Sequence, residues 1–431
     1  MVLGGEADNR ALAKSPFRGN RMNRSRCNGA RCGTGTATLF MIAMVAPGPV
    51  HAVPVQTDDG AFTRYELLAP ASHAFRIVYE ITATTPGATT YFNPIRTGSI
   101  ASNEHVTDRV SGAPLTFTEV GGDAARAGGV ANATPASRYI AVMLARPVPE
   151  NGGSRIRIDK TYEDAKSYHS DGVGIVFDRS LGIKRNTVVL PVGYRLAAVN
   201  VPVQVVQQAD GRIAVSFWNA TPVPMPLVIR ALPTRAPVPA GSSLAAMISE
   251  RAAQTREIVY YLRAPETHSF DLTHDYTEER PGVGAYVNVV RAGSTVSNPS
   301  AHDLDTGEKL TAEMVRGAAI TAIDPHETVV NDATTAVVFR FPPVVAGGSR
   351  RIRIAETYTD SVRYTLAGDE LVWHRAFGRP ANAVVLPAGW VLTNSTIPAT
   401  IGLLPDGRTR LDFINPRPDE IDVVITARRA V

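Results

Sequence analysis

Cysteine is almost absent from this chain. The 431 residues contain two cysteines, Cys27 and Cys32, and both lie within the first 52 residues. That segment has the pattern of a secretory leader, so we expect the mature chain to contain no cysteine. An exported protein without cysteine cannot use disulfides. Its hydrophobic cores alone must therefore hold it together, which is feasible for a domain of about 170 residues.

The leader is predicted from residues 1–52. Five arginines, from Arg18 to Arg31, precede a short apolar stretch at residues 37–45, and Val50-His51-Ala52 fits a small-residue cleavage site. Two alternatives stay open: translation that starts at Met22, with residues 1–21 an extension, and an uncleaved anchor. The apolar stretch is shorter than the roughly 20 residues that span a bilayer. We therefore expect a periplasmic or secreted protein with no membrane span in the mature chain.

An excess of charge of one sign is also missing. The chain has 44 Lys and Arg against 40 Asp and Glu. The leader holds seven of the former and two of the latter, so the remainder, with 37 and 38, is nearly neutral. A nucleic-acid or anionic-membrane partner needs a clustered basic face. Neither partner is expected here.

Signatures of catalysis and of cofactor binding are missing as well. The sequence contains no H-E-x-x-H, G-x-S-x-G or Walker motif. His73 and His268 stand at equivalent places in the sequence. No residue of a metal-binding type is retained next to both of them. We expect them to be hydrogen-bonded turn residues, and we predict no metal and no cofactor.

What the chain does contain is an internal duplication. His73 returns as His268 and Tyr91 as Tyr286, a step of 195 residues, and after one inserted residue Tyr162 returns as Tyr358. The duplication predicts two homologous domains, at 60–232 and 257–431, separated by a linker at 233–256.

Both copies have the alternation of β-strands. Phe75, Ile77, Tyr79 and Ile81 alternate with polar or smaller residues, and Ile156 and Ile158 alternate with arginines. Each copy also has an Asp-Gly pair between two strand-like segments, which favours a hairpin with a type I′ turn. Those pairs are Asp210-Gly211 and Asp406-Gly407. The pattern predicts an all-β protein of two tandem antiparallel β-sandwich domains.

The linker is rich in proline, with Pro233, Pro237 and Pro239. After it, Ser243 is placed to cap a short helix that runs to about Thr255. We expect this helix to dock one domain on the other, and the alternative is a helix that binds a partner.

One polar block is retained in both copies. It combines tyrosines with a carboxylate and a guanidinium, groups that could stack on a sugar or peptide and hydrogen-bond to it. The alternative is a set that determines the fold, with Tyr hydroxyls bonded to a turn and an Arg–Asp pair that closes a sheet edge. The candidate ligand-binding residues are Tyr162, Asp164, Tyr168 and Arg179, with their equivalents Tyr358, Asp360, Tyr364 and Arg375.

The copies also differ at charged positions. Lys160 becomes Glu356, Asp178 becomes His374 and Arg185 becomes Ala381. Asp178, Lys184 and Arg185 lie near Arg179 in the first copy only, so one copy could hold a working site. Ordinary drift of surface residues is the alternative.

Two functional hypotheses follow. The first is an exported, non-catalytic binding or structural module of the cell envelope or extracellular space, with an envelope protein or an extracellular polymer as partner. The second is a hydrolase or lyase in which Asp164 or Asp360 is the acid or base and Arg179 or Arg375 holds an anion. A third possibility, a β-sandwich unit supplied to a peptidase-like assembly, rests on analogy of fold alone.

Overall fold

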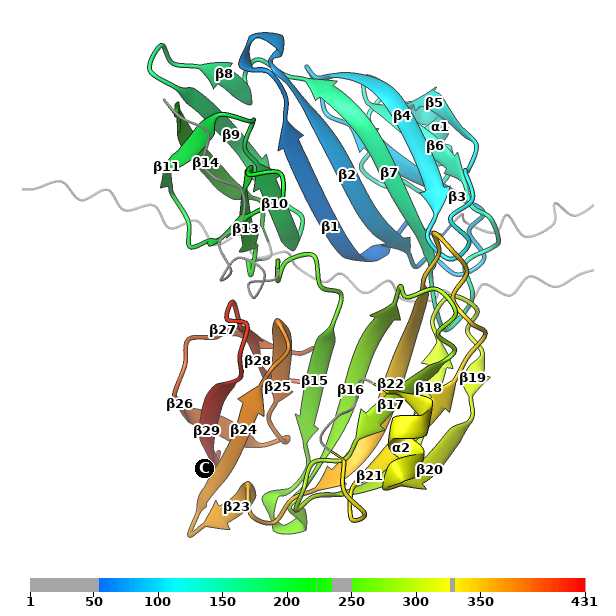
Figure 1. The fold of residues 1–431 in the computed structure, drawn as a ribbon, viewed down its shortest axis with the longest axis vertical. Coiled ribbons are helices and arrows are strands. Elements are labelled where there is room, and N and C mark those ends of the chain that lie inside the picture. The colour runs from blue at the N-terminus through cyan, green and yellow to red at the C-terminus, as the bar shows by residue number, and fades with distance from the viewer. Residues whose placement is uncertain (1–53, 222, 235–249, 326–329, 431) are drawn as a thin grey trace, which may run out of the picture. The chain divides into compact units, whose positions relative to one another are not determined.

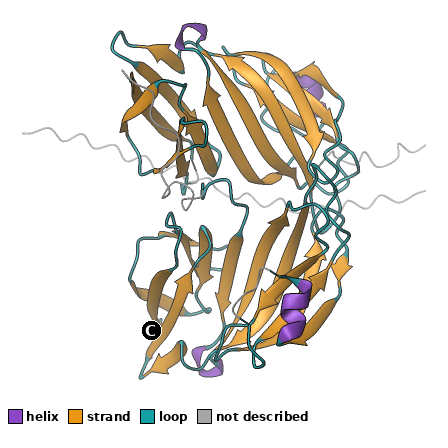
Figure 2. Ribbon diagram, viewed as in Figure 1, coloured by secondary structure: helices purple, strands orange, loops and turns teal. Residues whose placement is uncertain are grey.

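The structure is a computed structural model that describes residues 54–430 apart from 222, 235–249 and 326–329. Strands make up 54% of it and helices 5%, which confirms the predicted all-β class (Figure 2). The expected leader lies outside the described residues. None of the described helices has the length and apolar character that a membrane crossing requires.

Each copy is built on one large sheet. In the first copy it has seven strands (Figure 1). In order across the sheet they are β12 (Gln204–Gln207), β13 (Ile213–Trp218), β10 (Arg185–Val189), β1 (Asp58–Leu67), β2 (Ala74–Ala83), β7 (Ser154–Glu163) and β4 (Ile100–Asp108).

Two smaller sheets pack against the same face of this large sheet. One buried core contains Phe75 of β2, Ile140 of β6 and Phe177 of β9, which come from three different sheets. The four-stranded sheet is β11 (Tyr194–Val199), β14 (Met225–Pro233), β9 (Ile175–Leu181) and β8 (Tyr168–Ser170). The three-stranded sheet is β3 (Thr90–Ile95), β6 (Arg138–Met143) and β5 (Phe117–Gly121), followed by helix α1 (Gly122–Ala127). The first copy is therefore a sandwich with one large layer and a divided second layer.

The second copy repeats this plan. Its large sheet is β19 (Lys309–Leu310), β18 (Thr295–Asp303), β22 (Arg350–Thr359), β16 (Ser269–Glu278), β15 (Glu257–Leu262), β25 (Ala381–Val385), β28 (Thr409–Ile414) and β27 (Thr400–Leu403). The four-stranded sheet is β23 (Tyr364–Ala367), β24 (Glu370–Phe377), β29 (Ile421–Arg429) and β26 (Trp390–Ser395). The three-stranded sheet is β17 (Ala285–Val289), β21 (Thr335–Arg340) and β20 (Ala312–Arg316), and α2 (Ala318–Ile323) follows it.

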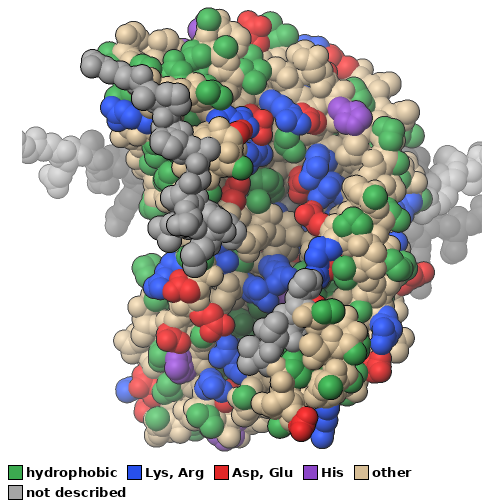
Figure 3. Space-filling model, in the orientation of Figure 1, with side chains coloured by type: hydrophobic (Ala, Val, Ile, Leu, Met, Phe, Trp, Pro, Cys, Tyr) green, Lys and Arg blue, Asp and Glu red, His purple; other side chains and the backbone are tan. Residues whose placement is uncertain are grey.

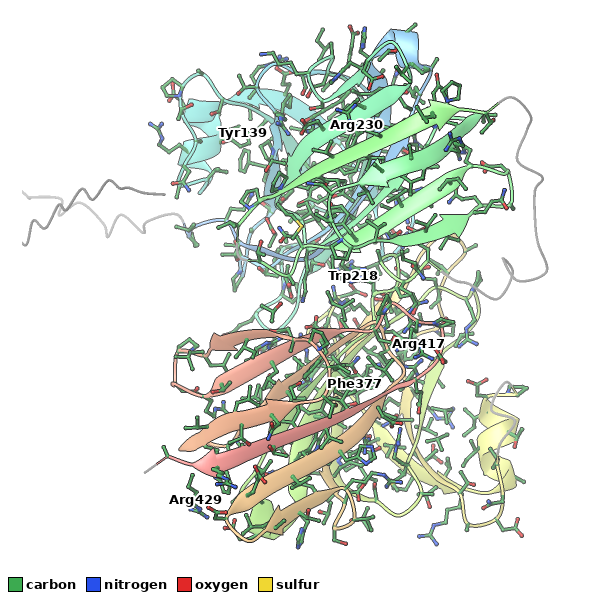
Figure 4. All side chains as sticks on the ribbon, turned by 90° about the vertical axis from the view of Figure 1, so that its left-hand side faces the viewer. Tyr139, Trp218, Arg230, Phe377, Arg417 and Arg429 are labelled. Atoms are coloured by element: carbon green, nitrogen blue, oxygen red, sulfur yellow. The ribbon has the colours of Figure 1, made fainter. Side chains whose placement is uncertain are left out.

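Strand alternation gives each four-stranded sheet one buried face, whereas the three-stranded sheets are buried on both faces, with α1 or α2 residues in the second core. On the four-stranded sheets some of the outward side chains are charged. Arg230 of β14 and Arg429 of β29, both labelled in Figure 4, pair with Asp171 at 2.7 Å and with Glu266 at 2.5 Å.

Each large sheet contains one parallel pair among its antiparallel neighbours. Phe62 of β1 pairs with Arg185 of β10, and Glu257 of β15 pairs with Ala381 of β25. A parallel pair requires a crossover connection. Here the chain between the two partners forms the whole three-stranded sheet and two strands of the four-stranded sheet, whose other two strands follow later in the chain.

The turns are repeated as closely as the strands. His73 and His268 follow the short 3₁₀ turns Pro70–Ser72 and Pro265–Thr267, with left-handed φ angles of 52° and 51°. Each donates a hydrogen bond from Nδ1–H to a backbone carbonyl, as expected for turn residues: Tyr168 O at 3.1 Å and Tyr364 O at 2.8 Å.

The two Asp-Gly pairs lie in hairpins as predicted, but the turn type differs. Gly211 has a φ of 84°, whereas Asp210 does not have a positive φ. The amide of Gly211 donates to Gln208 O at 2.9 Å, and Gln208 N donates to Arg212 O at 2.8 Å. This is a type I turn followed by a left-handed glycine. The predicted type I′ turn is wrong because only the glycine adopts the left-handed conformation.

Most of the predicted linker helix lies outside the described residues. Its described end, from Glu250 to Thr255, contains a turn at Ala252 and no helix. Arg185 donates to the carbonyls of Ala252 at 2.9 Å and Gln254 at 3.1 Å. This part of the linker is therefore held by backbone hydrogen bonds to a buried arginine.

The described parts of both copies belong to one compact unit. Arg155 of β7 forms two hydrogen bonds with Asp305, at 2.6 and 2.8 Å, and a third with Ser349 Oγ at 3.0 Å. Sequence alternation predicted that Arg155 faces solvent, yet it is 6% exposed and Asp305 is fully buried. The contact with the second copy explains the burial.

A glycine pair beside α1 provides a test of the packing under the three-stranded sheet. A Cβ on Gly122 would lie 1.7 Å from Thr134 O, whereas a Cβ on Gly121 would have no neighbour within 4 Å. We expect Gly122→Ala to lower the free energy of unfolding by about 1–3 kcal/mol. Gly121→Ala should change it by less than about 0.5 kcal/mol. Urea unfolding of the two variants measures the difference, and equal effects would contradict this packing.

Candidate functional site

A pocket of about 230 Å³ opens on the inner face of the large sheet in the first copy. Its walls come from β1, β2 and β7 of that sheet, from β3 of the three-stranded sheet and from β9 of the four-stranded sheet. It therefore lies where the divided second layer leaves the large sheet uncovered. The polar residues that line it are Tyr65, Tyr79, Asn93, Arg96, Lys160, Tyr162 and Arg179, and we call it the Lys160 pocket.

Lys160 lies on β7, two residues after Ile158, and shares the inward face of that strand. The side chain is 4% exposed. Its Nζ donates to Asn93 Oδ1 at 2.6 Å and lies 4.8 Å from the centre of the Tyr162 ring. Burial lowers the pKa of Lys160 to about 8. An ammonium group has three donors, so the amine keeps donors for a ligand.

The amine has no carboxylate partner. Among the described residues, no carboxylate oxygen lies within 4.0 Å of Lys160 or of Arg96, which is exposed. Glu104 acts on Lys160 from further away and raises its pKa, but burial has the larger effect. The pocket thus presents positive charge that the protein itself does not neutralise.

Arg179 forms the wall of the pocket on the side of the four-stranded sheet. Its guanidinium carbon lies 5.8, 5.4 and 5.7 Å from the ring centres of Tyr65, Phe75 and Tyr162. Cation–π contacts of this kind stabilise a buried guanidinium. Arg375 in the second copy has the same surroundings, at 5.7, 5.4 and 5.6 Å from three equivalent rings.

Asp164 lies behind Arg179 and does not line the pocket. It accepts hydrogen bonds from Ser167 Oγ at 2.8 Å, Ser99 Oγ at 3.1 Å and Arg179 Nη1 at 3.2 Å. Burial by itself raises its pKa, but the hydrogen bonds from Ser167 and Ser99 and the charge of Arg179 outweigh burial. The pKa of Asp164 is therefore below its ordinary value.

Asp360 is held in the same way in the second copy. It accepts from Ser294 Oγ at 2.9 Å and from Arg363 Nη1 at 3.1 Å, and Arg375 Nη1 lies 4.0 Å away. Burial raises the pKa of Asp360, but the hydrogen bonds from Arg363 and Ser294 lower it by more, so the net shift is downward. Both aspartates are thus anions whose oxygens are already hydrogen-bonded, which does not suit a general acid or base at neutral pH.

The two remaining tyrosines of the retained block hold turns. The hydroxyl of Tyr168 donates to Leu68 O at 2.8 Å, and that of Tyr364 donates to Arg263 O. Of the eight predicted residues, the structure brings Tyr162 and Arg179 to the Lys160 pocket. Asp164 and Asp360 lie in the turns after β7 and β22, whereas Tyr168 and Tyr364 tie β8 and β23 to the turns after β1 and β15.

The equivalent region of the second copy carries different chemistry. Glu356 stands in the place of Lys160 and accepts from Asn288 Nδ2 at 2.6 Å. His274 stands in the place of Tyr79. Burial raises the pKa of Glu356 to about 7 and lowers that of His274 to about 3. Glu356 Oε1 and His274 Nε2 are buried without a hydrogen-bond partner.

The exchange of Lys160 for Glu356 is therefore not drift of surface residues, because both side chains are buried. The other charged residues specific to the first copy do not gather at a site. Asp178 points outward on the strand where Arg179 points inward. Arg185 is bonded to the linker, and Lys184 lies 3.5 Å from Glu257.

Two signals in the sequence point to Lys160. Extending the alternation of Ile156 and Ile158 by one more step places Lys160 on the inward face. Lysine is also rare in this chain. Its five lysines are Lys14, Lys160, Lys166, Lys184 and Lys309. A charged residue at an inward-facing position is the signal that could have indicated a site here.

On the face drawn in Figure 3, basic and acidic side chains are interspersed. Among the described residues no group of three or more His, Cys, Asp or Glu is placed to hold a metal ion.

Comparison with known proteins leaves the family open. No family model matches the chain, and no curated protein matches it. Among solved structures, an aminopeptidase N family protein from Idiomarina loihiensis has 8% identity and a TM-score of 0.26, over 40% of this chain and 29% of that one. A two-domain M1 zinc metallopeptidase bound to L-tryptophan has 11% identity and a TM-score of 0.27, over 39% and 41%.

A third structure, a protein from Parabacteroides distasonis proposed to be a protease, has 11% identity and a TM-score of 0.24, over 86% and 92% of the two chains. The match spans less than half the length of the first two structures. At these identities and scores the similarities carry no functional argument.

Removal of the Asp164 charge tests its role beneath Arg179. We expect Asp164→Asn to lower the free energy of unfolding at pH 7 by about 2–4 kcal/mol, because a buried guanidinium loses its anion. Since the folded-state pKa is depressed, this stabilisation is present above the ordinary value of 3.8 and is lost as the pH falls through the folded pKa. The difference in free energy of unfolding between variant and wild type should therefore become smaller below about pH 4.

Chemical denaturation between pH 3 and pH 7 measures this gap. Asp178→Asn, an exposed change beside Arg179, is the matched control and should have little effect at any pH. A constant gap for Asp164→Asn across this range would contradict the interpretation.

Glu356 gives the opposite pH dependence. Between its ordinary value of 4.5 and about 7, the folded protein keeps a proton that the unfolded chain has released. Stability therefore falls as the pH rises through this window. Glu356→Gln removes the ionisation. Between pH 5 and pH 8 the free energy of unfolding of this variant should therefore fall by about 2 kcal/mol less than that of wild type. Urea unfolding at the two pH values measures this difference, with Glu313→Gln as the exposed control. The same fall in the free energy of unfolding for all three proteins would refute the prediction.

Proposed function

We propose that this chain is an exported, non-catalytic binding module that holds a small anionic group in the Lys160 pocket. The observation that carries the proposal is the Lys160 amine, which lines the pocket with Arg96 and Arg179 and is hydrogen-bonded to Asn93 but has no carboxylate partner among the described residues. Cationic donors held in place at low dielectric favour an anion over water.

The size of the cavity supports a small group. At about 230 Å³ it is below the range that accommodates drug-sized ligands. A carboxylate or phosphate fits, either on a free small molecule or at the end of an extracellular polymer. The ring of Tyr162 and those of Tyr65 and Tyr79 offer apolar contact to the atoms next to the anion.

The charge reversal at Glu356 supports assignment of the site to the first copy. A buried carboxyl at the equivalent place repels an anion when it is ionised and offers one donor at most when it is neutral. The duplication therefore retains the scaffold in both copies and the anion-binding group in one.

The hydrolase or lyase hypothesis loses its main support. It needs Asp164 or Asp360 free to exchange a proton with a substrate, yet both aspartates are occupied by hydroxyl and guanidinium donors.

Calorimetric titration of residues 53–431 with acetate, glyoxylate and inorganic phosphate tests the proposal. We expect saturable binding at pH 7 that weakens at least tenfold in Lys160→Met. Affinity should fall as the pH rises through about 8, because a cation is lost above its pKa.

Lys184→Met, which removes an exposed lysine of the same copy, is the matched control and should bind as wild type does. If Lys160→Met binds the same anions equally well, the pocket is not the site. Thermal stability gives a second readout, since a ligand at 100 times its Kd adds about 2.7 kcal/mol.

A further inference from the structure

Lys160 stands apart from every other cation of the protein. The chain has 39 arginines and five lysines. Of the four lysines in the described residues, Lys166, Lys184 and Lys309 are exposed, and Lys160 alone is buried. Where a buried cation is needed to pair with an acid, as at Arg155 and Arg179, the protein uses arginine.

This choice has a chemical meaning. A guanidinium stays protonated in proteins, whereas a buried lysine readily gives up its proton and becomes a nucleophile. Arginine at position 160 would also bind an anion. The property that lysine adds is a neutral amine, because burial and the neighbouring cation Arg179 disfavour the charged form.

We propose that Lys160 captures a small oxo acid, a molecule with an aldehyde or ketone beside a carboxylate, as a reversible imine. The inference rests on the proposed function, because the carboxylate of the ligand is the anion that the pocket holds. It adds a covalent step and a ligand class.

The step is balanced without an oxidant or reductant. The lone pair of Nζ attacks the carbonyl carbon, and the C=O bond opens to a carbinolamine. Uptake of one proton from solvent and loss of one water then form the C=N bond of a protonated imine, and hydrolysis returns that proton. The protonated imine keeps one N–H, which is placed to donate to Asn93 Oδ1 as the free amine does now at 2.6 Å. Hydrolysis by one water reverses the step.

The surroundings explain the choice of an oxo acid over a simple aldehyde. Arg96 is exposed and has no carboxylate within 4.0 Å among the residues that the structure describes. Its guanidinium is available to a carboxylate attached to the carbonyl that reaches Nζ. In the second copy Glu356 has no amine to offer, so the proposal assigns capture to the first copy alone.

Reductive trapping tests the proposal on residues 53–431. The protein is incubated with glyoxylate and cyanoborohydride at pH 7, and peptide masses report carboxymethylation at each lysine. With a pKa of about 8, Lys160 is neutral in roughly one molecule in ten, against roughly one in a few thousand for an ordinary lysine. We expect Lys160 to be labelled at least tenfold faster than Lys166, Lys184 and Lys309, which serve as controls within the same digest.

Two variants separate the contributions. Arg96→Gln should slow labelling of Lys160 by glyoxylate and leave its labelling by acetaldehyde unchanged. Lys160→Arg should abolish trapping at that position while it keeps calorimetric binding of acetate.

Uniform labelling of the four lysines, or slowest labelling at Lys160, overturns the covalent proposal. If Lys160→Arg then still binds acetate, the proposed anion site survives without the imine. If wild type binds no anion and traps no glyoxylate, both proposals fail.

Discussion

The structure depends on an arginine held among aromatic rings where three sheets meet. Arg179 and Arg375 occupy the same place in the two copies, each against three rings and each beside an aspartate on the turn that follows a long central strand. Burial of this charge is tolerated because rings, serine hydroxyls and a carboxylate replace its water. The same contacts connect the four-stranded sheet to the large sheet.

A charge at this point has a consequence for the neighbouring space. The second layer of each sandwich is divided into two sheets, and the guanidinium stands at the division. In the first copy the space beside it forms the Lys160 pocket. In the second copy Asn288 donates a hydrogen bond to Glu356 at the equivalent place. One scaffold thus carries a site that differs in charge between its two copies.

Much of the fold could be predicted because it depends on local patterns. Alternation along residues 75–81 and the Asp-Gly turns are readable without knowledge of distant contacts, and the 195-residue step shows that both halves share one fold. The sheet order could not be read, since the pairing of β1 with β10 joins residues far apart in sequence. The burial of Arg155 escaped prediction for the same reason, because its partner Asp305 belongs to the other copy.

The candidate site was predicted only in part. Retention in both copies drew attention to Asp164 and Tyr168, which stabilise turns that any copy of the fold needs. Lys160, which differs between copies, belongs to the proposed anion site, and its position there depends on a cavity that forms only when β3 and β9 approach the same sheet. Similarity between halves of a duplicated chain reports the scaffold, and dissimilarity at a buried position reports the chemistry.

The parallel pairing of β1 and β10 also bears on how the chain is made. β1 is an interior strand of its sheet, yet its partner on one side follows about 120 residues later. Contacts of such sequence separation form slowly, because a long loop must close before they contribute. During synthesis or export, the first copy exposes one edge of β1 until β10 has emerged. Each large sheet is formed only by strands of its own copy. The large sheet of the first copy can therefore fold before the second copy begins to fold.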